Sequence, residues 1–169
     1  LLGRCKKKTQ TYPSGKKKEI TYTYVPGAKE GTTTALIGTI TENGKETAYT
    51  YDGRGNILEI CTKELDTGKV TDHMLYTYTG MNQVIREEDA VRGRTFTYAY
   101  DLGGNLLENK KYYLVNGVEE LRGTDTYTYS SGWKDQLTSF NGKAITYDAM
   151  GNPLSYMGMN LTWEKGRQL

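Results

Sequence analysis

A three-residue strand pattern that recurs along most of the chain is the feature that most constrains its fold. The pattern is an aromatic or aliphatic residue, then usually Thr, then an aromatic residue. Because successive side chains of a β-strand point to opposite faces, the first and third residues share one face and the middle residue lies on the other. We call this pattern the triplet. Its seven copies occupy residues 22–24, 49–51, 76–78, 98–100, 127–129, 145–147 and 161–163.

Three triplets run directly into a second motif, Asp-x-x-Gly-Asn, whose residues are typical of turns. An Asp at the first position can accept hydrogen bonds from backbone amides ahead of it, and Gly at the fourth can take the left-handed conformation of a bulged hairpin. Two degenerate copies, at 78–82 and 129–133, keep a Gly but lose the Asp. We therefore predict a structural role for Tyr51, Asp52, Gly55, Asn56, Tyr100, Asp101, Gly104, Asn105, Tyr147, Asp148, Gly151 and Asn152.

A second turn family alternates with the first, and three of its members are Asn-Gly, a strong hairpin signal. The alternation predicts an antiparallel meander of about thirteen strands, from residues 20–24 to 161–163, without helical segments. A strip of that many strands must twist, curl or close, so we expect an all-β, curved or spiralling sheet. The turns of this family lie at Asn43-Gly44, 66–68, Arg92-Gly93, Asn116-Gly117, Asn141-Gly142 and Met157-Gly158.

The composition agrees with a thin β-sheet. The chain has 15 Tyr and 20 Gly but only 2 Phe, and 36% of its residues are hydrophobic. Tyr suits a half-buried pleated surface and Gly suits turns, while the low hydrophobic fraction indicates much wet surface. We therefore interpret residues 1–169 as a single array of about six to seven repeats. Clear repeats begin at about residue 22, after a basic leading segment, 1–21.

The net charge of +2 gives the whole chain no drive toward nucleic acid or an anionic membrane. Basic residues gather only locally, at 6–8 and 16–18, as is common in a solvated strand or loop. No apolar run is long enough to insert in a membrane, and the first residues lack the apolar stretch of a signal peptide. Cys5 and Cys61 lie far apart in the sequence, and their spacing leaves a disulfide undecided.

The repeated segments 49–58, 98–107 and 145–154 resemble the YD repeats of bacterial RHS proteins, and 133–137 and 163–169 are similar to late repeats of an RHS core. The resemblance implies a β-strip that spirals into a hollow shell around a toxic domain. It also implies a secreted or cell-surface parent protein, with the remainder of the RHS core and an enclosed toxin domain as partners. Related repeats occur in insecticidal toxin complexes and in teneurins.

The chain lacks the Asp-Pro-x-Gly region in which RHS cores end and cleave themselves, so the resemblance implies no autoproteolytic residue here. It implies instead an excised segment that begins and ends within the array. Such a strip would expose its first and last strands, and exposed edges invite self-association. YD repeats are also linked to carbohydrate binding, so a glycan- or protein-binding module that uses the aromatic face is the alternative function.

No residue pattern predicts catalysis, a cofactor or a metal site. The single histidine, His73, cannot build a multi-histidine metal site, and we interpret it as a strand residue. Cys61 lies in a β-rich run and is typical of an inert, buried thiol. The acidic run 87–89 lies beside the Arg92-Gly93 turn and suggests a solvated loop. We therefore expect a structural scaffold or shell segment that is not an enzyme.

Overall fold

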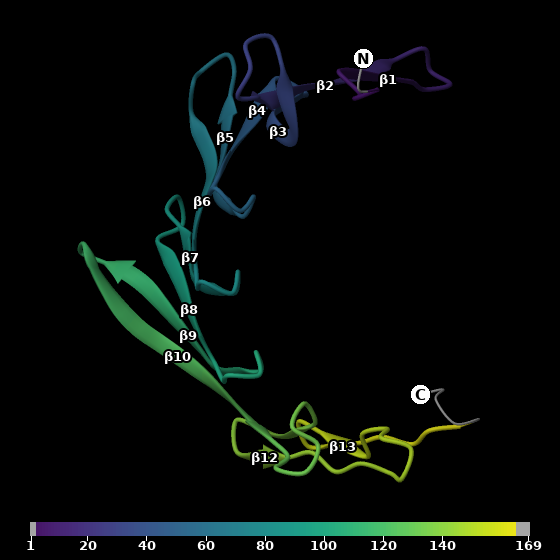
Figure 1. The fold of residues 1–169 in the computed structure, drawn as a ribbon, viewed down its shortest axis with the longest axis vertical. Coiled ribbons are helices and arrows are strands. Elements are labelled where there is room, and N and C mark those ends of the chain that lie inside the picture. The colour runs from purple at the N-terminus through teal and green to yellow at the C-terminus, as the bar shows by residue number, and fades with distance from the viewer. Residues whose placement is uncertain (1–2, 165–169) are drawn as a thin grey trace. The chain divides into compact units, whose positions relative to one another are not determined.

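The computed structural model describes residues 3–164. The regular secondary structure in this range consists only of β-strands. The chain divides into two units, Leu1–Arg94 and Thr95–Leu169. Within each unit the strands of the main sheet follow one another in the order of the sequence (Figure 1), and paired strands run antiparallel. The prediction of an all-β antiparallel meander is therefore confirmed, while the curvature of the whole strip stays a prediction.

The first unit begins with a hairpin in the segment that the sequence suggested as a basic leader. Lysine-rich β1 pairs with β2, from Lys7 opposite Thr21 to Thr11 opposite Lys17. The sheet therefore starts earlier than residues 20–24. The strands of this unit are β1 (Lys7–Thr11), β2 (Lys17–Pro26), β3 (Thr33–Glu42), β4 (Lys45–Tyr51), β5 (Ile57–Glu64), β6 (Val70–Tyr78) and β7 (Val84–Asp89).

The second unit has its longest arms in the hairpin of β9 and β10, whose register shifts at a bulge between Leu121 and Gly123. A separate two-stranded sheet follows the main sheet near the end of the chain. The strands are β8 (Arg94–Tyr100), β9 (Leu106–Val115), β10 (Val118–Tyr129), β11 (Leu137–Phe140), β12 (Lys143–Ala144), β13 (Ser155–Tyr156) and β14 (Met159–Asn160).

Two of the predicted strands, at 145–147 and 161–163, are wrong. In the first, only Tyr147 forms an isolated bridge, to Pro153. Proline lacks the N–H that would continue a ladder, so pairing stops there and the two-residue strands β13 and β14 follow. In the second, Trp163 donates its indole N–H to the Pro153 carbonyl at 2.6 Å. The rest of the tail, 165–169, lies outside the described residues.

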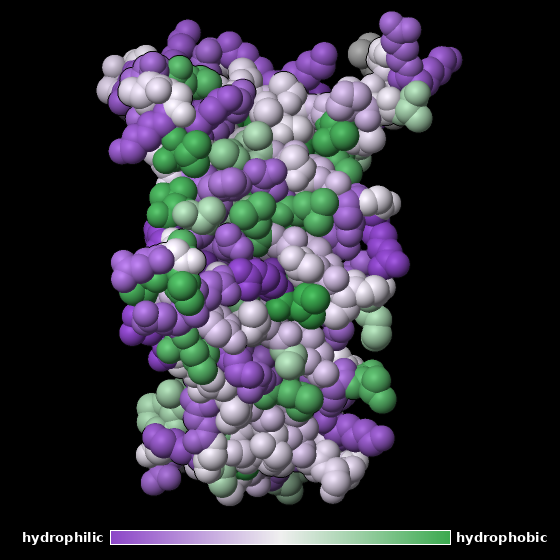
Figure 2. Space-filling view, turned by 90° about the vertical axis from the view of Figure 1, so that its left-hand side faces the viewer, coloured by the Kyte–Doolittle hydropathy of each residue, from purple (hydrophilic) through white to green (hydrophobic). Residues whose placement is uncertain are grey.

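The side chains of the triplets alternate as the period of two predicts. In all seven copies the first and third residues are buried or half-buried and the middle residue is exposed. Ile145, which is 6% exposed, is the only buried hydrophobic residue within the described part of the chain. Figure 2 shows hydrophobic side chains at the surface as separate patches between hydrophilic ones. Stability must therefore come from contacts between neighbouring strands, because residues 3–164 form no thick core.

The Asn-Gly turns have the mirror-image geometry that suits tight hairpins. At Asn43 and Gly44 the φ angles are 49° and 73°, and Asn116-Gly117 and Asn141-Gly142 have similar values. Positive φ at both central residues defines a type I′ turn, which matches the twist of the flanking strands. The Met157-Gly158 turn adopts the same conformation, with φ of 51° and 86°.

Candidate functional site

The Asp-x-x-Gly-Asn motif forms a closed turn around the Asp carboxylate. In the first copy, the backbone amides of Arg54 and Asn56 donate to Oδ1 of Asp52, each at 2.9 Å. The side-chain amide of Asn56 donates to Oδ2 of Asp52 at 2.8 Å. The backbone amide of Gly55 donates to the Asp52 carbonyl at 3.1 Å and completes the turn. Both carboxylate oxygens are thus engaged within the turn, in charge-assisted bonds.

The other two complete copies repeat this geometry. Asp101 accepts bonds of 2.8 and 2.9 Å from the backbone amides of Gly103 and Asn105, and a third, of 2.9 Å, from the Asn105 side chain. Asp148 accepts the equivalent bonds from Met150 and Asn152, at 2.8 to 2.9 Å. The structure therefore gathers the predicted Asp, Gly and Asn residues into three nearly identical turns.

The fourth position of the motif has the left-handed backbone conformation. Gly55, Gly104 and Gly151 have φ of 89°, 91° and 82°, a region that costs glycine little and other residues more. The variable positions differ: Gly53 does not have a positive φ, and a Cβ on it would meet nothing within 4 Å. A Cβ on Gly103 would lie 3.3 Å from Oδ1 of Asp101, so that glycine is confined by its neighbour.

A degenerate copy keeps the turn with substitute residues. The hydroxyl of Thr79 replaces the Asp carboxylate and accepts bonds from the backbone amides of Met81 and Gln83, at 3.1 and 3.2 Å. Asn82, with φ of 63°, takes the left-handed position. The glycine that this copy keeps, Gly80, lies at a variable position of the turn and does not have a positive φ. The signal in the sequence was Asn82, because Asn tolerates this conformation better than other non-glycine residues.

Neighbouring turns of this type bind one another within each unit. In the first unit, the Asn56 amide donates to Oδ1 of Asn82 at 2.9 Å, and Arg54 donates to the Gly80 carbonyl. In the second unit, the Asn105 amide donates to the Lys134 carbonyl at 3.2 Å. The motif Asn thus has two functions, closing its own turn and reaching the next.

The last residue of the triplets forms a ladder of hydrogen bonds that sequence reasoning missed. Five tyrosine hydroxyls each donate to a backbone carbonyl that lies earlier in the chain, at 2.6 to 3.0 Å. Burial raises the pKa of four of these tyrosines, Tyr51, Tyr78, Tyr129 and Tyr147, which keeps their hydroxyls protonated donors. We call this arrangement the tyrosine ladder. Its bonds are Tyr24 to Cys5, Tyr51 to Ile37, Tyr78 to Ile57, Tyr129 to Leu106 and Tyr147 to Leu137.

The carbonyls that accept the ladder bonds occupy a recurring position in the pairing of the strands. Ile37 pairs across the strands with Tyr24, and its carbonyl accepts the hydroxyl of the following ladder residue, Tyr51. Ile57 likewise pairs with Tyr51 and accepts from Tyr78. At each of these pairs the register shifts by one residue, which is a β-bulge and turns the strand locally. The excess of Tyr over Phe was the available signal, since only Tyr carries the donor.

Substituting Asp52 by Asn should destabilise the first unit at neutral pH and not at acid pH. The side chain of Asn56, followed by the backbone amides, lowers the pKa of the Asp52 carboxyl. This stabilisation is therefore present above the unfolded pKa, near 3.9, and is lost as pH falls through the lower folded value. In urea denaturation, Asp52→Asn should have a lower midpoint than the wild type at pH 7, and the gap should close below about pH 3.

The exposed Asp135, substituted by Asn, is the matched control, and it should leave the midpoint nearly unchanged at both pH values. If Asp52→Asn had the same midpoint as the wild type at pH 7, Oδ2 of Asp52, which accepts from the Asn56 side chain, would not stabilise the fold. Asn also favours turn positions, so Asp52→Asn would lose almost no stability if Asp52 acted only through its preference for turns.

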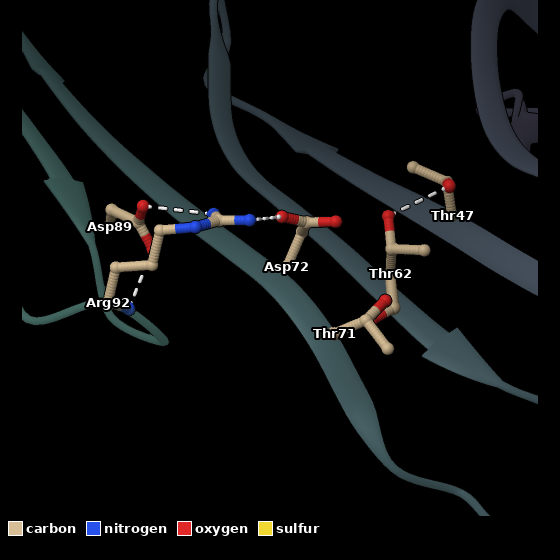
Figure 3. A network of polar contacts seen from close by, with 6 residues as sticks. All are labelled: Thr47, Thr62, Thr71, Asp72, Asp89 and Arg92. Atoms are coloured by element: carbon tan, nitrogen blue, oxygen red, sulfur yellow. Dashed lines mark hydrogen bonds and ion pairs between the residues drawn. The ribbon is translucent and has the colours of Figure 1, made fainter.

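Arg92 forms a cluster of polar contacts, which we call the arginine clamp, at the Arg92-Gly93 turn. This turn lies at the other end of a hairpin from the Asp turns. The guanidinium of Arg92 bonds Oδ2 of Asp89 at 3.0 Å and Oδ1 of Asp72 at 2.9 Å, and its backbone amide bonds Oδ1 of Asp89 (Figure 3). Burial opposes the charged form of Asp89, yet the bonds from Arg92 lower its pKa. The interpretation of 87–89 as solvated loop is therefore wrong: all three residues lie in strand β7, none of them is exposed, and Asp89 is only 7% exposed.

Removing the clamp should destabilise the first unit. Arg92→Ala leaves the buried Asp89 carboxylate with fewer donors, and a buried charge that loses its partner is costly. The urea midpoint should fall clearly. Lys7→Ala removes an exposed ion pair with Glu19 in the same unit and should change the midpoint little, as loss of exposed pairs does. Equal midpoints for the two variants would show that the clamp contributes nothing.

The remaining candidates have ordinary positions in the sheet. Nε2 of His73 lies 2.7 Å from Oε1 of Glu59, and His73 pairs across the strands with Cys61. Both cysteines are free, with Cys5 exposed and Cys61 half-buried. Within residues 3–164, no three His, Cys, Asp or Glu side chains form a metal-binding group, and no helix could cross a membrane.

No family model and no curated protein matches this chain. Solved structures that resemble it include a crystal structure of TcdB2-TccC3-TEV, with 13% identity over 87% of this chain and 11% of that chain, at a TM-score of 0.40. Another is a Tc holotoxin pore of Photorhabdus luminescens, with 14% identity over 86% of this chain and 11% of that chain, at a TM-score of 0.35. This chain thus spans a small part of either protein, and likenesses at this level assign no function.

Proposed function

We propose that this chain is a wall segment of a larger bacterial RHS-type shell and that its function is structural, without catalysis. The segment would continue on both sides into further repeats of the same core, and the closed shell would enclose a toxin domain in a secreted or cell-surface protein. This proposal extends the resemblance of three segments, 49–58, 98–107 and 145–154, to YD repeats.

One observation carries the proposal: the polar groups of the motif are used to join repeats to one another. Asp52 directs both carboxylate oxygens into its own turn, Asn56 reaches the next turn, and the Tyr51 hydroxyl reaches back to an earlier strand. A binding or catalytic site needs such groups free to meet a ligand. Here they build a wall whose repeats hold their neighbours, as in other repeat proteins.

Protease protection of the longer protein tests this function. In the wild type, the region enclosed by the shell should resist digestion under native conditions. Gly55→Val strains a turn of the wall and should expose that region, whereas Gly53→Val, two residues away with a permissive backbone, should not. Equal digestion of the non-repeat region in wild type and both variants would overturn the proposal.

A further inference from the structure

Three hairpins share an Asn-Gly turn, and the three turns have nearly the same backbone geometry. The φ angles of the Asn residues are 49°, 51° and 50°, and those of the Gly residues are 73°, 81° and 75°. All of these residues are exposed. Because the dipeptide and the conformation are the same, a chemical difference between the turns must come from their surroundings. The turns are Asn43-Gly44, Asn116-Gly117 and Asn141-Gly142.

An Asn-Gly dipeptide can react within itself. The Gly backbone nitrogen attacks the side-chain carbonyl carbon of the Asn, and the side-chain nitrogen leaves as ammonia with the proton that the backbone nitrogen gives up. The resulting succinimide ring takes up one water from solvent and opens to Asp or to isoaspartate. Glycine permits the attack because no Cβ stands beside its nitrogen. The Asn side chain must rotate toward that nitrogen, so a bond that holds it elsewhere slows the reaction.

The side chain of Asn141 is held by two hydrogen bonds to β10. Its Oδ1 accepts from the backbone amide of Thr126 at 2.7 Å, and its Nδ2 donates to Oδ1 of Asp125 at 2.8 Å. The backbone amide of Asn141 also donates to the Thr126 carbonyl, at 2.9 Å. Rotation of the side chain toward Gly142 has to break both side-chain bonds, so this turn is protected from the reaction.

The Asn116 turn lacks these restraints. Its side chain makes no hydrogen bond within residues 3–164, and neither does that of Asn43. The Asn43 turn is held in another way, because the Gly44 carbonyl accepts from the Leu65 backbone amide at 2.8 Å. Asn116 lies instead at the tip of the longest hairpin of its unit, beside Val118, which is 65% exposed. A tip with so few contacts opens most readily.

We propose that Asn116 is a site of spontaneous deamidation in the folded protein, that Asn43 reacts more slowly and that Asn141 is protected. The product carries a carboxylate in a turn that had no charge, beside exposed Leu114 and Val118. Its isoaspartate form also adds a carbon to the backbone, which lengthens a turn of only two central residues. The site does not depend on the proposed wall function, since it uses none of the motif residues.

Incubation of the 169-residue chain at mildly alkaline pH, followed by tryptic digestion and mass spectrometry, measures the three sites separately. Asn141 should deamidate more slowly than Asn116 by about tenfold or more, because two hydrogen bonds must break first. In the chain unfolded by urea, the three rates should become similar, since the dipeptide is the same. The tryptic peptides that contain the sites are 30–45, 112–122 and 135–143.

Releasing the Asn141 side chain tests the cause of its protection. Asp125→Ala removes the acceptor of Nδ2 and should raise the deamidation rate at Asn141, while the rate at Asn43, in the other unit, stays unchanged. Asp125 also pairs with Lys111 at 2.9 Å. Lys111→Gln removes that pair, keeps the bond to Asn141 and is the matched control, which should leave the rate at Asn141 unchanged.

Four results would overturn the proposal. They are equal rates at Asn116 and Asn141 in the folded chain, no product at Asn116, a difference between these two sites that persists in urea, and an unchanged rate at Asn141 in the Asp125→Ala variant.

Discussion

Gly55→Val is expected to destabilise the first unit by about 1–3 kcal/mol, the cost of holding a non-glycine residue in a sparsely allowed backbone region. The φ of 89° places Gly55 in the left-handed region, and a β-branched side chain is strongly disfavoured there. A Cβ at this position would meet no atom within 4 Å. The loss therefore measures backbone strain and not a steric clash. Urea denaturation followed by circular dichroism gives the value.

Gly53→Val is the control in the same turn, because Gly53 has ordinary φ and equally open surroundings. It should cost clearly less than Gly55→Val. Gly103 is a poorer control than its place in the motif suggests, since an added Cβ would press on Asp101. If the Gly53 variant lost as much stability as the Gly55 variant, the assignment of the turn register would be wrong.

Removing two hydroxyls of the tyrosine ladder is expected to cost about 1–3 kcal/mol, at roughly 0.5–1.5 kcal/mol for each hydrogen bond. The double variant Tyr51→Phe and Tyr78→Phe keeps both rings and deletes only the bonds to Ile37 and Ile57, of 2.9 and 2.8 Å. Both of these hydrogen bonds are partly buried, so water replaces them incompletely. The free energy of unfolding in urea is the measurement.

The first tyrosines of the same triplets provide the matched control. Tyr49 and Tyr76 lie two residues away on the same strands and are also half-buried, and the structure of residues 3–164 gives their hydroxyls no hydrogen bond. The double variant Tyr49→Phe and Tyr76→Phe should therefore change stability little. A loss equal to that of the ladder variant would mean that the second tyrosines act through ring packing alone.

The alternation of the strands and the position of the turn glycines could be predicted because both depend on residues close in the sequence. A period of two assigned the faces at Tyr22 and Tyr24, and turn chemistry placed Gly55, Gly104 and Gly151 at the left-handed position. These features need only the local backbone, which a motif of five residues describes completely.

The clamp and the ladder could not be predicted because they depend on register between strands. Arg92 meets Asp72 across 20 residues of sequence, through the pairing of β6 with β7. The Ile37 carbonyl, which accepts from the Tyr51 hydroxyl, lies where one extra residue shifts the pairing of β2 with β3. A bulge of one residue changes which groups meet, and the triplets give no sign of it.

The two ends of each hairpin are under different constraints. Where the Asp turns and the tyrosine ladder meet, neighbouring repeats of the same unit are fixed to one another, but at the Asn-Gly end the arms can lengthen without altering that attachment. The hairpin of β9 and β10 does so: its arms run to Val115 and Val118, and its tip carries exposed Tyr113, Leu114 and Val118. One repeat can therefore have longer strands than its neighbours without any change in the way it is attached to them. A peptide tag inserted between Asn116 and Gly117 should be accommodated, and it would give a handle for attaching this segment to a surface.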